Sequence, residues 1–146
     1  MELGTVGAVL SFALKQEEKI LGVYEESIKT ENESDLLDLL RETARNHKKM
    51  KRALRRLRRE NVTEMILEPI HGLNSDDFDI KQHQGKKAST QEWLVALEKI
   101  ERKQAEFLEK SAAKVSFLPE VRQRLDTMSK TARMNASNLD EARSVD

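Results

Sequence analysis

The sequence predicts an all-α protein: a four-helix bundle of two antiparallel hairpins joined by a long crossover. This prediction rests on the composition, on four segments of helical periodicity, and on the short, long, short order of the connections. Of 146 residues, 38% are hydrophobic and 36% are charged, with two prolines and five glycines. The length suits one domain with its own core, and the composition favours helix over sheet. We therefore expect a single domain over residues 1–146.

The first two helices are indicated by apolar residues that recur at steps of three and four. The first should run from about Thr5 to about Thr30, with the stripe Val6, Leu10, Ala13, Glu17, Ile20, Tyr24 and Ile28. The second should begin at Asn32 or Ser34 as N-cap, with Asp35 in its first turn. Its stripe is Leu37, Leu40, Ala44, His47, Met50 or Lys51, Leu54 and Leu57.

The periodicity breaks over residues 61–88, where Pro69, Gly72 and Gly85 are turn signals. The segment exceeds an ordinary turn and is long enough to cross the length of a bundle. It contains Val62, Met65, Ile66, Leu67, Ile70, Leu73, Phe78 and Ile80. This apolar content predicts that the crossover packs on the bundle, partly as a short helix, or contacts another subunit.

The third helix starts with a capping box from Ser89 to Glu92, and the fourth has Pro119 at its first helical position. The third stripe is Leu94, Leu97, Glu101, Ala105, Leu108, Ala112 and Val115. The fourth is Val121, Leu125, Met128, Ala132, Asn135, Leu139 and Ala142, and we expect residues 143–146 to fray. Short links make helices one and two, and helices three and four, antiparallel neighbours.

Several function classes are excluded or disfavoured by the sequence. The absence of cysteine excludes disulfides, thiolate metal sites and cysteine nucleophiles. No phosphate-binding glycine loop or nucleophile elbow is present, so nothing indicates conventional hydrolase or transferase chemistry. The apolar stretch over residues 6–14 is too short to span a bilayer and has no basic region before it. We expect a cytoplasmic protein without a membrane partner, and the sequence favours a non-enzymatic role while leaving enzymatic activity open.

Three ionisable residues, Glu17, His47 and Glu101, fall on apolar stripes of three different helices. Burying a carboxylate without a partner costs about several kcal/mol, so a core position normally excludes it. Counting residues from the hairpin turns places all three at one depth, together with Asn135. They are therefore candidates for a metal site, or for a hydrogen-bonded polar layer with Asn135 that sets helix register.

In the polar-layer interpretation, His47 is a cation between two carboxylates, or one carboxylate stays protonated because it is desolvated. A third possibility rotates Glu17 or Glu101 to the rim of the bundle, where long side chains reach water. Glu18 and Glu98 are then alternatives for the buried positions.

Glu17 is followed seven residues later by Tyr24, and Glu101 at the same spacing by Leu108, after Phe107. Over about residues 5–142 the chain resembles the ferritin-like superfamily, especially its rubrerythrin-like branch. That family has a Glu on the first and third helices, often with an aromatic residue seven positions on. It also has Glu-x-x-His on the second and fourth helices, where this chain has Ala44-Arg45-Asn46-His47 and Ala132-Arg133-Met134-Asn135.

The resemblance implies a degenerate di-iron site. In the family the Glu of each Glu-x-x-His motif bridges the two metals, and alanine replaces both here. We therefore expect no cofactor, with a single Fe or Zn ion on Glu17, His47 and Glu101 as the alternative. The first hypothesis is a non-catalytic or weakly metal-binding relative that acts as an oligomeric helical interaction protein. The second is a mononuclear metalloprotein of iron or oxidative-stress chemistry.

A third hypothesis is an anion- or nucleic-acid-binding module on the second helix. Its basic face includes Lys48, Lys49, Arg52, Arg55, Arg56 and Arg59. Cations cluster in this way on surfaces that bind anionic partners. They also favour the C-terminal half of any helix, and acids such as Glu25, Glu26, Glu98 and Glu106 could neutralise them. The zero net charge and the few aromatic residues for base stacking make nucleic-acid binding the less favoured interpretation.

Overall fold

The computed structural model describes residues 1–61, 69–81 and 88–144 and confirms the predicted four-helix bundle. The helices are α1 (Val6–Thr30), α2 (Ser34–Glu60), α3 (Thr90–Lys114) and α4 (Pro119–Ser144), and a 3-10 turn, η2, covers Ser75–Asp77. The described ranges contain no β-strand, only an isolated bridge between Glu2 and Asn74. None of the helices in these ranges combines the length and the apolar character needed to cross a membrane.

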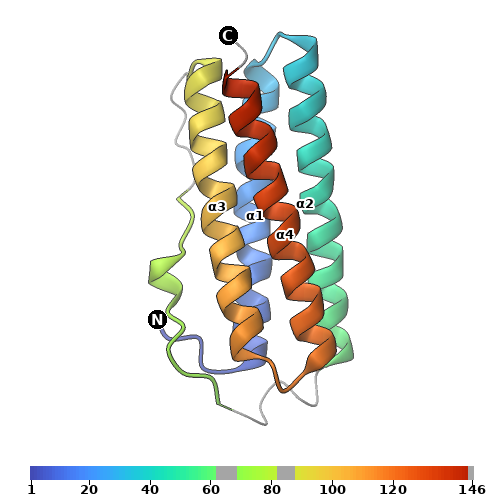
Figure 1. Cartoon of the computed structure of the whole chain (residues 1–146), viewed down its shortest axis with the longest axis vertical. Helices are drawn as coiled ribbons and strands as arrows, with labels where there is room; N and C mark the ends of the chain where they lie inside the picture. The colour runs from blue at the N-terminus through green and yellow to red at the C-terminus, as the bar shows by residue number, and fades with distance from the viewer. Residues whose placement is uncertain (62–68, 82–87, 145–146) are drawn as a thin grey trace.

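The helices form two hairpins, α1 with α2 and α3 with α4, which pack side by side (Figure 1). Helix α1 also contacts α3, and α2 contacts α4. Helices α2 and α3 begin at the same end of the bundle, so the crossover returns along its full length (Figure 1). The predicted short, long, short order of connections is therefore confirmed.

The helix starts are fixed largely by side-chain caps, as predicted at Ser89, whose capping box with Glu92 is formed. Pro119 is the first residue of α4, also as predicted. The expected cap of α2 was wrong: Glu33, not Asn32 or Ser34, accepts hydrogen bonds from the first amides of the helix. The Glu33 carboxylate has two oxygens, which reach two amides at 3.1 and 2.8 Å, and Ser34 is already helical.

Helix α4 continues two residues beyond Ala142, where fraying was expected to begin. Arg143 explains the extension, because its guanidinium contacts Asp140 at 2.7 Å and Glu98 of α3 at 3.4 Å. These contacts hold the last turn against the neighbouring helix. Residues 145–146 of the predicted tail lie outside the described residues.

The crossover packs on its own bundle wherever it is described. Its apolar side chains Ile70, Leu73, Phe78 and Ile80 are all buried. The buried amide of Gln16 donates to the Phe78 carbonyl at 2.5 Å and accepts from the Ile80 amide at 3.4 Å, which ties α1 to the crossover. In the described part of the crossover, the predicted short helix corresponds to the 3-10 turn η2. Val62, Met65, Ile66 and Leu67 lie outside the described residues.

The hydrophobic core consists of two clusters. The larger one includes Leu10, Leu54, Phe107 and Leu125, and the smaller one includes Ile20, Leu40, Leu97 and Leu139. Along each helix, the residues of one cluster lie on one side of a buried polar position and those of the other cluster on the opposite side. A polar layer therefore divides the core across all four helices.

Candidate functional site

The polar layer brings Glu17, His47 and Glu101 together, as predicted, and all three are completely buried. The Nδ1 atom of His47 lies 2.5 Å from Oε2 of Glu17. The Nε2 atom lies 2.7 and 2.6 Å from the two oxygens of Glu101. The imidazole thus bridges two carboxylates, one from each hairpin.

Three further side chains donate hydrogen bonds to these carboxylates. The hydroxyl of Tyr24 donates to Glu101 at 2.9 Å, and the amide of Gln104 donates to Glu17 at 3.0 Å. The amide of Asn135 approaches both Glu101 oxygens at 3.3 and 3.4 Å, which places this predicted member in the layer. Each carboxylate therefore has hydrogen-bond donors besides the imidazole, as buried charges require.

Helical periodicity explains why these residues meet. Glu17, His47 and Glu101 occupy the same apolar stripes as the core residues before and after them, so they must point inward with those residues. The same geometry excludes Glu18 and Glu98, the alternatives for the buried positions. Glu18 is exposed, and Glu98 is only half-buried and pairs with Arg102 and Arg143.

The charge state of the layer follows from the surroundings of His47. Burial by itself lowers the pKa of an imidazole, but the attraction of Glu101 and then of Glu17 outweighs it and raises the pKa of His47 to about 10. At neutral pH both ring nitrogens therefore carry hydrogen and donate to the carboxylates. Burial, and then the negative charge of Glu101, raises the pKa of Tyr24 well above its ordinary value, so its hydroxyl stays a neutral donor.

The donor set does not fit a di-iron centre. The two nitrogens of His47 lie on opposite edges of the ring and face different carboxylates, so a single ion can use only one of them. The methyl groups of Ala44 and Ala132 occupy buried positions in the same region and supply no ligand. Within the described ranges, no group of three or more His, Cys, Asp or Glu side chains is arranged to hold a metal ion. A single ion on Glu17, His47 and Glu101 stays a prediction.

Sequence reasoning missed two members of this network. Gln104 lies one turn after Glu101, and this three-residue spacing was the available signal. Asn46 donates to Asn135 at 3.2 Å and so links α2 to α4 beside the layer. The Oε1 atom of Gln104 is buried and has no hydrogen-bond partner among the residues described.

The second candidate site is the basic face of α2. Lys48, Lys49, Arg52, Arg55, Arg56 and Arg59 are all exposed, and none forms an ion pair within the described ranges. Within the described ranges, none of the four acids expected to neutralise these cations forms an ion pair with them. Glu26 pairs with Lys29, Glu98 with Arg102 and Arg143, and Glu106 with Lys110. The neighbouring Lys51 does reach Glu18, at 3.9 Å.

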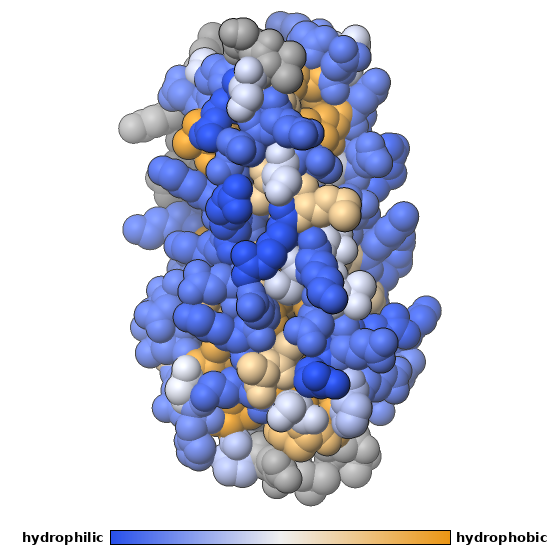
Figure 2. Space-filling view, viewed as in Figure 1, coloured by the Kyte–Doolittle hydropathy of each residue, from blue (hydrophilic) through white to orange (hydrophobic). Residues whose placement is uncertain are grey.

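The exposed surface is otherwise mostly hydrophilic. Figure 2 shows polar side chains over most of one face, with smaller apolar areas between them. Among the described residues, the exposed large hydrophobic side chains are Met1 and Met134. The basic face of α2 is therefore distinguished by its single sign of charge and not by its polarity.

The comparisons with known proteins add no relative: no protein-family model, no curated protein and no solved structure matches the chain.

Proposed function

We propose that this chain is a non-catalytic, rubrerythrin-like member of the ferritin-like superfamily that acts as a helical interaction protein. In this proposal, an imidazolium between two carboxylates stabilises the centre of the bundle where the family keeps a di-iron site. The main support is the position of His47, whose two nitrogens hydrogen-bond to Glu17 and to Glu101. A cation of the protein itself thus stands between the carboxylates that would otherwise attract a metal ion.

The alanines of the two incomplete motifs support the same proposal. Ala44 and Ala132 stand three residues before His47 and Asn135, where the family has its bridging glutamates. Replacing two acids by alanine removes two negative charges, and the remaining trio of two carboxylates and one imidazolium has one net negative charge. Two ferrous ions would leave a large uncompensated positive charge in this environment.

Elemental analysis tests the proposal. Protein expressed in iron- and zinc-supplied medium should contain less than about 0.1 ion per chain, since the donor set is incomplete. The matched variant restores both motifs by Ala44→Glu, Ala132→Glu and Asn135→His, and it should gain up to about two ions per chain. One ion per wild-type chain, lost in His47→Gln, would instead establish the mononuclear metalloprotein.

Assembly is the second part of the proposal. An interaction protein needs a binding surface, and most soluble oligomers are assembled from copies of one chain. We expect a dimer or larger assembly by sedimentation at micromolar concentration. A strictly monomeric mass at that concentration would remove homo-oligomerisation from the proposal.

A second candidate function is the binding of an anionic macromolecule by the basic face of α2. It is favoured by the six exposed cations that form no ion pair in the described part of the chain. Cations without protein partners keep their full charge available to phosphates. We favour nucleic acid as the test partner, because its regular charge gives the clearest salt dependence.

Fluorescence anisotropy with a labelled DNA duplex measures this binding directly. Affinity should fall about 10-fold or more between 50 and 200 mM salt, because each neutralised phosphate releases counterions. The triple variant Arg52→Gln, Arg55→Gln, Arg56→Gln should lose binding, whereas Arg122→Gln on exposed α4 surface should keep it. Absent or salt-insensitive binding would eliminate this candidate.

A further inference from the structure

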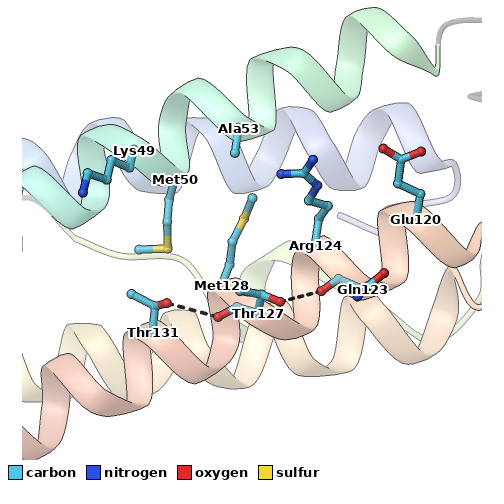
Figure 3. A pocket seen from close by; sticks show the side chains of 9 residues that line it. All are labelled: Lys49, Met50, Ala53, Glu120, Gln123, Arg124, Thr127, Met128 and Thr131. Carbon is cyan, nitrogen blue, oxygen red and sulfur yellow. Dashed lines mark hydrogen bonds between the residues drawn. The ribbon is translucent and has the colours of Figure 1, made fainter.

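A groove of about 550 Å³ lies between α2 and α4, and no residue of the polar layer lines it (Figure 3). Met50 and Ala53 of α2 face Met128 of α4 across it, and Lys49 and Arg124 lie at its sides. Its volume falls within the range of about 300–1,000 Å³ typical of small-molecule sites. The groove is therefore large enough to accommodate a small organic ligand.

The floor of the groove is apolar and adaptable. Met50 and Met128 belong to the larger core cluster, line the groove, and are each 5% exposed. Methionine side chains are flexible and polarisable, so they adjust to flat or irregular apolar surfaces. Ala53, half-buried between them and the rim, leaves space that a larger side chain would fill. The floor suits the apolar body of a ligand.

The rim favours an anion. Lys49 and Arg124 are exposed and form no ion pair with any described residue. The hydroxyls of Thr127 and Thr131 donate to carbonyls of their own helix, at 3.0 and 3.1 Å, so they do not donate to a ligand (Figure 3). The charged hydrogen-bond donors of the groove are thus the ammonium and the guanidinium.

One acid, Glu120, also lines the groove, at the end that lies beyond Arg124 (Figure 3). It forms no ion pair with Arg124 or with any other described residue. An anionic group is therefore expected near the methionines, between Lys49 and Arg124, and away from the Glu120 carboxylate. This polarity also disfavours a cationic ligand over most of the groove.

We propose that this groove binds a small amphipathic anion, with an apolar body against Met50 and Met128 and an anionic group held by Arg124 and Lys49. This inference goes beyond the proposed function and does not depend on the state of the polar layer. An apolar helix of another protein is the competing occupant, and it would require more apolar surface than the two methionines provide.

The test uses two dyes with the same apolar body. Anilinonaphthalene sulfonate carries an anionic group, and N-phenyl-1-naphthylamine lacks it. Wild-type protein should bind the sulfonate saturably at one site per chain, with at least about 10-fold higher affinity than the neutral dye. Arg124→Gln should weaken the sulfonate by about 3- to 10-fold, the usual range for a partly exposed charged contact, and leave the neutral dye unchanged.

Two further variants locate the site. Ala53→Trp fills the groove from a half-buried position and should weaken both dyes at least about 10-fold, with helical circular dichroism as the check of folding. Arg122→Gln makes the same charge change on α4 outside the groove and should alter neither dye. No saturable sulfonate binding, equal affinity for the two dyes, or binding unchanged by both Ala53→Trp and Arg124→Gln would overturn the proposal.

Discussion

Helix α2 carries a buried cation and several exposed cations within a few residues of each other. His47 is completely buried, and both of its nitrogens contact carboxylates. Lys48 and Lys49 follow directly, are exposed, and form no ion pair in the described ranges. The difference teaches that only the buried charge needs a protein partner, because water solvates the exposed ones. Exposed cations without partners are consequently free to bind something else.

Removing the buried cation should have the largest effect on stability. His47→Ala leaves the carboxylates of Glu17 and Glu101 buried without their shared partner. The free energy of unfolding should fall by about 3–5 kcal/mol, the usual cost of breaking a buried pair. Urea denaturation measures it. Lys48→Ala on the same helix is the control and should change stability by about 0.5 kcal/mol or less. Equal losses of stability in the two variants would contradict the conclusion that only the buried charge needs a protein partner.

Raising the pH should weaken the layer without any mutation. The pKa of His47 is about 10 in the folded state, above its ordinary value of 6.5. Below pH 6.5 both states are protonated, and the stabilisation is complete. As the pH rises toward 10, the unfolded chain gives up this proton first, so stability falls. We expect a loss of at least about 2 kcal/mol between pH 6.5 and 10.

Urea denaturation across this pH range measures that loss, and His47→Gln supplies the control. The variant keeps every surface lysine, so any pH dependence of stability that remains in it is caused by surface groups. A slope as steep in His47→Gln as in the wild type would show that the imidazole does not cause it.

The two carboxylates should differ in a predictable order. Glu101 accepts hydrogen bonds from His47, Tyr24 and Asn135, whereas Glu17 accepts from His47 and Gln104. Glu101→Gln should therefore cost more than Glu17→Gln, each within about 1–3 kcal/mol. Both should also lower the pKa of His47, which NMR titration of its ring protons detects. Greater stability in either variant would mean that the buried charge costs more than its pairing contributes.

The smallest effect is expected on the exposed face. The triple variant Arg52→Gln, Arg55→Gln, Arg56→Gln should change the free energy of unfolding by no more than about 0.5 kcal/mol per residue, because these side chains have no protein partner to lose. Thermal unfolding at low and high salt measures it. A rise in stability would show that the cations repel one another in the free protein. It would also support the proposal that they bind an anionic partner.

The sequence by itself determined the helices and their pairing. Periodic stripes, the Ser89 capping box and Pro119 are local signals, and the α2 cap and the end of α4 differed from the prediction by only a few residues. The same stripes placed Glu17, His47, Glu101 and Asn135 in one layer, since core-facing residues at equal depth must meet.

Only the tertiary structure decided how those residues interact. A stripe fixes which way a side chain points, but it does not determine which ring nitrogen faces which carboxylate. It also does not show that Gln104 and Tyr24 complete the network, or that the acids near α2 have other partners. The groove between α2 and α4 is likewise a product of packing. Local sequence sets direction and depth, whereas partners depend on distances between helices that are far apart in the chain.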